Sequence, residues 1–249
     1  IKNFKKTEFF KIHGEIETPE GTFIAEGKAK EGSNYFNSSK IYNDNGFLKK
    51  DDAEEFIASL IKNAQSTEIS NITKSKEKKN PPLLFNLAEL QNECSKRFKI
   101  NPDETLSTLQ SLYEKKLVTY PRTDARGLST AVAKEIHKNI NKLNKFKAKE
   151  DIQKHVEEII STKATSKIMK SKYVDDSKIT DHYAIIPTGE GIDGYDKLTT
   201  MEKSVYELVL KRFLAIFFPP AEYSKLSIEI SIGEESFFAN EKVCTKRGY

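Results

Sequence analysis

The sequence contains few cysteines and no long hydrophobic run, and both absences narrow the class of protein. Its two cysteines, Cys94 and Cys244, are far apart, and neither belongs to a Cys-x-x-Cys pair. This argues against a zinc ribbon or a redox motif. We therefore expect a reducing, cytoplasmic compartment, with a single disulfide as the less favoured alternative. No apolar stretch approaches the ~20 residues of a membrane-spanning helix, so we expect no membrane association.

The charge balance is equally modest. Lys and Arg total 41 against 37 Asp and Glu, a formal net charge of +4. Such mild basicity indicates a nucleic-acid partner only where the charge is clustered. The 249 residues can form one large domain or two smaller ones. The chain begins at Ile1 and ends in what reads as an unfinished strand, so we expect it to be part of a longer protein.

Hydrophobic periodicity predicts a β-rich segment at the start of the chain. Residues 8–28 alternate apolar and polar side chains around the turn Thr-Pro-Glu-Gly, which is typical of a hairpin. A helix is expected from Asp51 or Asp52, because apolar residues recur from 56 to 64 at helical spacing. Residues 69–73 then return as a strand.

The next stretch, residues 74–80, is rich in lysine and ends at Pro81-Pro82. The simpler interpretation is a solvated linker. The alternative is a contact with DNA phosphates near a domain hinge, made by Lys76, Lys78 and Lys79.

The middle of the chain is helical in pattern, and its end turns β-rich again. Pro102 suits a first helical position, and Ser129 and Thr199 are expected helix caps. Residues 117–120 read as a short β-like run, and 226–232 alternate as a strand. The predicted fold class is α+β. Residues 1–80 and 199–249 would form a β-rich domain, and 81–198 an inserted, mainly helical domain.

The segment 117–124, Leu-Val-Thr-Tyr-Pro-Arg-Thr-Asp, holds the residues with the clearest chemistry. In an extended backbone Tyr120 and Arg122 face the same side, so both can address one phosphate. A phenol with its ordinary pKa near 10 is a poor nucleophile, and a guanidinium beside it favours the phenolate. By spacing alone, however, a strand tyrosine is more often a core or interface residue.

This segment resembles the active-site motif of type IA DNA topoisomerases, and its Tyr-Pro-Arg order resembles the bacterial topoisomerase III branch. Three further stretches resemble that family in the expected order. They are Pro-Pro-Leu-Leu-Phe-Asn-Leu at 81–87, Gln-x-Leu-Tyr-Glu at 110–114 and His-Tyr-Ala-Ile-Ile-Pro-Thr at 182–188. The resemblance covers essentially the whole chain. It implies a β-rich arch domain with an inserted helical cap that carries the tyrosine.

The resemblance also implies an activity, that of an isomerase that cleaves and reseals one DNA strand without ATP. Tyr120 would be the nucleophile that forms a 5′-phosphotyrosine, Arg122 would offset phosphate charge, and His182 would hydrogen-bond the phosphate region. Three more residues would contact or support the DNA backbone: Gln110, Asp124 and Thr188. The implied partners are single-stranded segments of negatively supercoiled or catenated DNA and, in a bacterial nucleoid, a helicase.

One family feature is missing. Type IA enzymes bind Mg²⁺ through acidic residues that include Asp-x-Asp, and no Asp-x-Asp occurs here. We therefore expect the Mg²⁺ ligands of the full-length enzyme to lie outside these residues, and the chain alone to be inactive.

Two alternatives bear on Tyr120. A tyrosine recombinase would need His-x-x-Arg, yet no histidine here has Arg at its third following position. The remaining alternative is a non-catalytic, basic module that binds single-stranded nucleic acid, in which Tyr120 stacks on a base.

Overall fold

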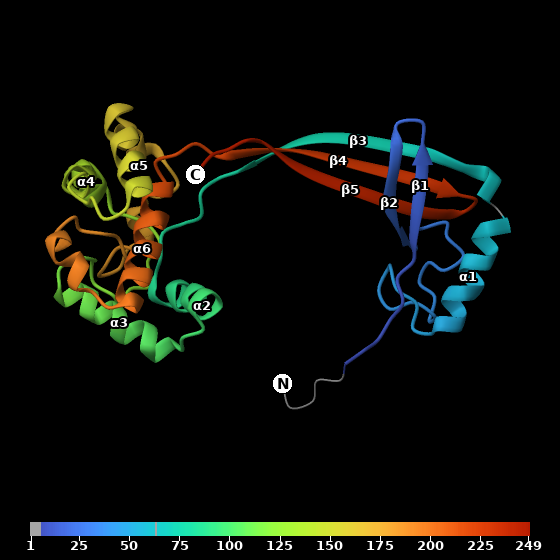
Figure 1. The fold of residues 1–249 in the computed structure, drawn as a ribbon, viewed down its shortest axis with the longest axis horizontal. Coiled ribbons are helices and arrows are strands. Elements are labelled where there is room, and N and C mark those ends of the chain that lie inside the picture. Colours follow the sequence, from blue (N-terminus) through green and yellow to red (C-terminus); the bar gives the residue numbers. More distant parts are fainter. Residues whose placement is uncertain (1–5, 63) are drawn as a thin grey trace. The chain divides into compact units, whose positions relative to one another are not determined.

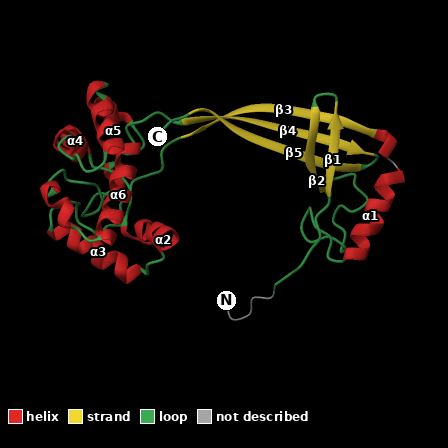
Figure 2. Cartoon of the chain, in the orientation of Figure 1, coloured by secondary structure: helices red, strands yellow, loops and turns green. Residues whose placement is uncertain are grey.

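The computed structural model describes residues 6–62 and 64–249, and the chain divides into two compact units (Figure 1). The sheet unit comprises Ile1–Lys78 and Glu222–Lys246, and the helical unit comprises Lys79–Ala221 and Arg247–Tyr249. The helical unit is thus inserted into the sequence of the sheet unit. Figure 2 shows strands gathered in one unit and most helices in the other, which confirms the α+β prediction.

The sheet unit is built on five strands in the order β1-β2-β5-β4-β3. The pairs β1/β2, β2/β5 and β4/β5 are antiparallel. The strands are β1 (His13–Thr18), β2 (Gly21–Lys28), β3 (Thr67–Lys79), β4 (Ala221–Ile232) and β5 (Glu235–Lys246). Thr18 Oγ1 donates to the Gly21 carbonyl at 2.7 Å and closes the turn between β1 and β2. The predicted hairpin over residues 8–28 is therefore confirmed.

A small aromatic core holds α1 (Lys50–Lys62) against the loop that precedes it. The ring centroids of Phe56, on α1, and Phe47 lie 5.2 Å apart, and the ring of Tyr35 meets both rings edge-on. On the sheet, Phe237 of β5 covers Gly27, where an added Cβ would lie only 3.2 Å from the ring. The 3₁₀ turn η1 (Ala64–Ser66) leads from this helix into β3.

The stretch 74–80, interpreted above as a linker, is instead part of a strand through Lys79. β3 runs without interruption from Thr67 and lies next to β4 at the edge of the sheet. Glu77 forms ion pairs with Lys225 of β4 and Lys242 of β5. The hydrogen bonds from these two lysines lower the pKa of Glu77 to about 2. These cross-strand pairs hold a segment whose own side chains predict only a polar linker.

The helical unit contains seven α-helical and 3₁₀ elements besides its longest helix, α6 (Thr200–Ala215). The others are α2 (Leu87–Phe98), α3 (Pro102–Glu114), α4 (Thr130–Leu143), α5 (Glu150–Ser161), η2 (Ala164–Lys170), η3 (Asp176–Lys178) and η4 (Ile192–Lys197). Ser129 caps α4 as expected, and Thr199 and Glu202 form the expected capping box of α6.

The expected domain division differs from the structure at α6. Residues 199–221, assigned above to the β-rich domain, belong to the helical unit. Val205, Tyr206, Val209 and Phe213 of α6 are fully buried in the same core as α2, α3, α4 and α5. A helix buried on so much of its surface must lie among other helices, because no sheet face alone would cover it.

Candidate active site around Tyr120

Tyr120 lies in an irregular segment that is held by two other segments of the helical unit. Residues 117–120 do not form the predicted strand, and only an isolated bridge joins Val118 to Pro187. The Thr119 amide donates to the Ile186 carbonyl at 3.0 Å, and the Ala184 amide donates to the Gly127 carbonyl at 2.9 Å. The 182–188 motif is therefore hydrogen-bonded to the backbone on both sides of Tyr120.

Two threonines that the sequence analysis did not single out strengthen these contacts. Thr119 Oγ1 donates to the Ala184 carbonyl at 3.1 Å and accepts from the Ile186 amide at 3.0 Å. Thr123 Oγ1 donates to the His182 carbonyl at 2.9 Å and accepts from the Ala125 amide at 3.1 Å. Because the two hydroxyls flank Tyr120, they fix its backbone relative to that of His182.

Burial alternates along the segment that carries Tyr120. Pro121 and Thr123 are buried, whereas Arg122 and Asp124 are exposed and Tyr120 is half-buried. This period of two is typical of extended backbone with one face inward. The residues with polar or ionisable chemistry therefore share the outer face.

Two aromatic rings contact the ring of Tyr120. Its centroid lies 4.2 Å from that of His182, with the planes inclined by 35°. Tyr113, near the end of α3, meets it edge-to-face at 5.6 Å and 84°. In the sequence, Tyr113 stands out only as part of the 110–114 motif. The one sequence signal for it is its position on the helix that leads directly into the Tyr120 segment.

Arg122 is exposed, and within residues 6–62 and 64–249 its guanidinium forms no hydrogen bond or ion pair. It is therefore available to an anion at the surface beside Tyr120. Asp124 is also exposed, and its carbonyl accepts a hydrogen bond from Asn86 Nδ2 at 3.0 Å. The backbone at Asp124 is thus anchored to the cap residue of α2.

The other candidate residues of the helical unit make internal contacts. Gln110 is half-buried and its Nε2 donates to Glu114 Oε1 at 3.2 Å on the same helix. Thr188 Oγ1 donates to the Lys116 carbonyl and accepts from the Glu190 amide at 3.0 Å. Thr188 therefore supports the backbone that precedes Tyr120, whereas the contact of Gln110 stays within α3.

The three candidate lysines lie on β3. Lys78 pairs with Glu222 at 3.5 Å, while Lys76 and Lys79 are exposed and form no ion pair with any residue that the structure describes. Lys76 and Lys78 belong to the sheet unit, whereas Tyr120 belongs to the helical unit.

A buried carboxylate fixes the end of α3 just before the Tyr120 segment. Glu202 of α6 is 6% exposed and accepts from Ser111 Oγ at 2.7 Å and from Lys115 Nζ. Its other oxygen accepts from the Thr199 amide at 2.8 Å. Burial alone would raise the pKa of Glu202, but the hydrogen bonds together lower it to about 2. One residue thus caps α6 and joins it to α3.

The described residues do not provide a metal centre. Among them, no three side chains of His, Cys, Asp or Glu gather closely enough to hold a metal ion. Divalent magnesium prefers carboxylate oxygens in octahedral geometry, and no such cluster is found among the described residues. Nor does any helix in the described part of the chain combine the length and apolarity required to cross a bilayer.

Fold and site together define a tyrosine-bearing helical unit inserted into an antiparallel sheet unit. The sequence matches the DNA topoisomerase family over residues 1–249, and the chain belongs to that family. It is 33% identical to a DNA topoisomerase 3 of Bacillus cereus over 250 residues, covering all of this chain and 31% of that protein. A Bacillus subtilis DNA topoisomerase 3 is 34% identical over 79% of this chain and 26% of its own length.

A solved structure shares the fold. Full-length topoisomerase I from Thermotoga maritima matches 90% of this chain and 32% of its own with a TM-score of 0.55 and 20% identity. The chain spans about a quarter to a third of the length of these relatives.

Proposed function

We propose that this chain forms the part of a type IA DNA topoisomerase that carries the DNA-cleaving tyrosine, Tyr120. The phenolic oxygen would attack a phosphodiester of single-stranded DNA. As the new oxygen–phosphorus bond forms, the bond from phosphorus to the 3′ oxygen breaks. The phenol loses its proton, and the departing 3′ oxygen gains one. The product is a 5′-phosphotyrosine and a free 3′-hydroxyl, and the reverse step reseals the strand without ATP.

The neighbours of Tyr120 have separate roles in this proposal. Arg122 binds the non-bridging oxygens of the scissile phosphate. His182 hydrogen-bonds the same phosphate region while its ring supports the ring of Tyr120. The exposed, unpaired state of Arg122 supports the proposal, since a guanidinium committed to a carboxylate would not serve a phosphate.

The remaining candidate contacts follow from DNA as partner. Gln110, Asp124 and Thr188 would contact the strand or hold the backbone that does so. Lys76, Lys78 and Lys79 would contact phosphates elsewhere. Mg²⁺ would be bound by residues of the full-length enzyme outside those described here, where it would offset phosphate charge. The full-length enzyme would relax or decatenate DNA in the bacterial nucleoid, with a helicase as cellular partner, and this chain alone would be inactive.

The observation that carries the proposal is the site itself: Tyr120 packed on His182, with a free Arg122 two residues away. The test is covalent trapping in the full-length protein with labelled single-stranded DNA and Mg²⁺. Wild type and Tyr113→Phe should leave label on denatured protein, and Tyr120→Phe should leave none. A labelled Tyr120→Phe protein would overturn the proposal. Absence of any adduct in wild type, with binding retained, would favour the non-catalytic binding module instead.

A further inference from the structure

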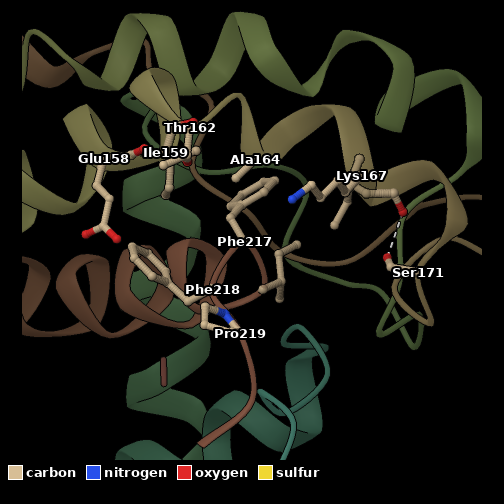
Figure 3. Close-up of a pocket in the computed structure, with 11 residues that line it drawn as sticks. Glu158, Ile159, Thr162, Ala164, Lys167, Ser171, Phe217, Phe218 and Pro219 are labelled. Atoms are coloured by element: carbon tan, nitrogen blue, oxygen red, sulfur yellow. Dashed lines mark hydrogen bonds between the residues drawn. The ribbon is translucent and has the colours of Figure 1, made fainter. Parts of the chain in front are cut away.

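The helical unit contains a cavity of about 460 Å³ to which none of the segments around Tyr120 contributes. It lies between the end of α5, the 3₁₀ helix η2 and the residues that follow α6 (Figure 3). Its volume lies within the range that accommodates small ligands.

The centre of the cavity is aromatic. Phe217 and Phe218 line it, together with Ile159 and Ile168. Phe217 packs edge-on against Phe213 at 5.3 Å, and Phe218 packs edge-on against His155 at 5.4 Å. Each phenylalanine ring is therefore held in place by a second ring of the protein. Aromatic walls of this kind stack on nucleobases with little dependence on sequence.

One side of the cavity carries uncompensated positive charge. Residues 159–174 include four lysines and no acidic residue. Within the described part of the chain, none of these lysines forms an ion pair: Lys163, Lys167, Lys170 and Lys172. Lys167 lines the cavity. Because side chains at i and i+3 of a 3₁₀ helix eclipse, Lys170 lies on the same side, about 6 Å further along η2.

The opposite end of the cavity carries an acceptor. Figure 3 shows Glu158 and Lys167 at the two ends, with Phe217 and Phe218 between them. The Glu158 carboxylate forms no ion pair with any residue that the structure describes. It can accept from the exocyclic amino group of cytosine or adenine, which thymine lacks.

We propose that this cavity is a second DNA site, which holds one nucleobase of a single strand with its phosphates on Lys167 and Lys170. Along the cavity, Lys167 is followed by the two phenylalanine rings and then by Glu158. A nucleotide presents its phosphate, its base and the exocyclic amino group of that base in the same order. The site favours cytosine or adenine over thymine. It is a binding site, so it does not depend on cleavage at Tyr120.

The phosphate contacts can be tested by fluorescence anisotropy over a range of salt concentrations. All proteins should carry Tyr120→Phe, so that no strand is cleaved. Lys167→Ala/Lys170→Ala should weaken binding of an oligo-dC and reduce the logarithmic salt slope by about 1 to 2, since each single-strand phosphate contact contributes ~0.7. The matched control is Lys147→Ala/Lys197→Ala, two exposed lysines without an ion pair among the described residues. An equal loss in the control, or none in the test variant, would overturn the proposal.

The base contact needs a separate comparison, between an oligo-dC and an abasic strand with the same number of phosphates. The unmodified cavity should favour the base-bearing strand roughly ten-fold, as expected for one stacked base. Ala164→Trp, which fills the cavity from η2, should abolish that preference while the lysine contacts remain. Phe217→Leu should also reduce the preference for the base-bearing strand, although it leaves the cavity open to the base.

The specificity for the base gives the final readout. Glu158→Ala should bring oligo-dC and oligo-dT to the same affinity. If folded Ala164→Trp and Phe217→Leu proteins keep the full preference for the base-bearing strand, the cavity is not a base site. Covalent trapping at Tyr120 would be unaffected by that result, so the two proposals can fail independently.

Discussion

The ring of Tyr120 lies against the ring of His182, with centroids 4.2 Å apart and planes inclined by 35°. The contact is built into the backbone, because Thr123 Oγ1 donates to the His182 carbonyl at 2.9 Å. The candidate nucleophile and a candidate phosphate ligand are thus held together in the chain without DNA. Such preorganisation reduces the rearrangement required for reaction.

Replacing His182 should impair cleavage without unfolding the protein, because its side chain is exposed. We expect His182→Ala to lower the rate of covalent adduct formation by roughly 10²-fold in the full-length enzyme, as for loss of one phosphate-directed donor. His137→Ala, an exposed histidine of α4, is the control. Equal rates of adduct formation for His182→Ala and His137→Ala would show that His182 takes no part in cleavage.

Tyr113 should act through its ring and not through its hydroxyl. The edge-to-face contact with Tyr120 needs only an aromatic ring, and such a pair contributes about 0.5–1.5 kcal/mol. Tyr113→Phe should therefore form adduct at the wild-type rate, while Tyr113→Ala should be slower by roughly 2- to 10-fold. The rates come from quenched time courses of covalent trapping. A Phe variant as slow as the Ala variant would show that the hydroxyl matters instead.

Thr123 should contribute to stability through its two hydrogen bonds. Thr123→Val keeps the shape of the side chain but leaves the His182 carbonyl and the buried Ala125 amide without their partner. We expect a loss of about 1–3 kcal/mol in the free energy of unfolding, measured by urea titration with far-UV circular dichroism. Thr180→Val, at an exposed position, should change stability little. Identical titration midpoints for the two variants would contradict this account.

The Glu202 contacts should make stability depend on pH in acid. Its pKa falls from an ordinary 4.5 to about 2 on folding, so its contribution is complete above pH 4.5 and is lost as pH falls towards 2. The full contribution is roughly 3 kcal/mol, at about 1.36 kcal/mol for each unit of pKa. Glu202→Gln should lower stability at pH 7 and flatten its decline between pH 4.5 and 2.

The matched control for that experiment is Glu157→Gln on the exposed side of α5. This variant should leave unchanged both the stability at pH 7 and its decline between pH 4.5 and 2. If the stability of Glu202→Gln falls as steeply as that of wild type between pH 4.5 and 2, other carboxylates determine the acid sensitivity.

Several local features could be predicted from sequence because short-range rules govern them. The caps at Ser129 and Thr199 need only a hydroxyl followed by a helical pattern, and both form. The hairpin over residues 8–28 needs only alternation and a turn, and it forms as well. The family itself follows from motifs of a few residues in a fixed order, since chemistry at a phosphate constrains the residue types.

Other features depended on partners distant in the chain. Residues 74–79 carry a linker-like composition, yet ion pairs from Glu77 to Lys225 and Lys242 hold them in the sheet. Residues 117–120 have a strand-like composition, yet they form one isolated bridge and rely on side-chain hydrogen bonds of Thr119. Helix α6 likewise belongs to the helical unit because the core of that unit buries its apolar side chains.

The sequence by itself determined the helices, the hairpin and the identity of Tyr120 as the residue of interest, because propensity, capping and motif order are local properties. The tertiary structure alone decided which side chains meet at that residue. Tyr113 and His182 reach the ring of Tyr120 from different segments, and no periodicity links them. Their contact exists because threonine hydrogen bonds and the packing of α3 on α6 fix three separate stretches of backbone in one place.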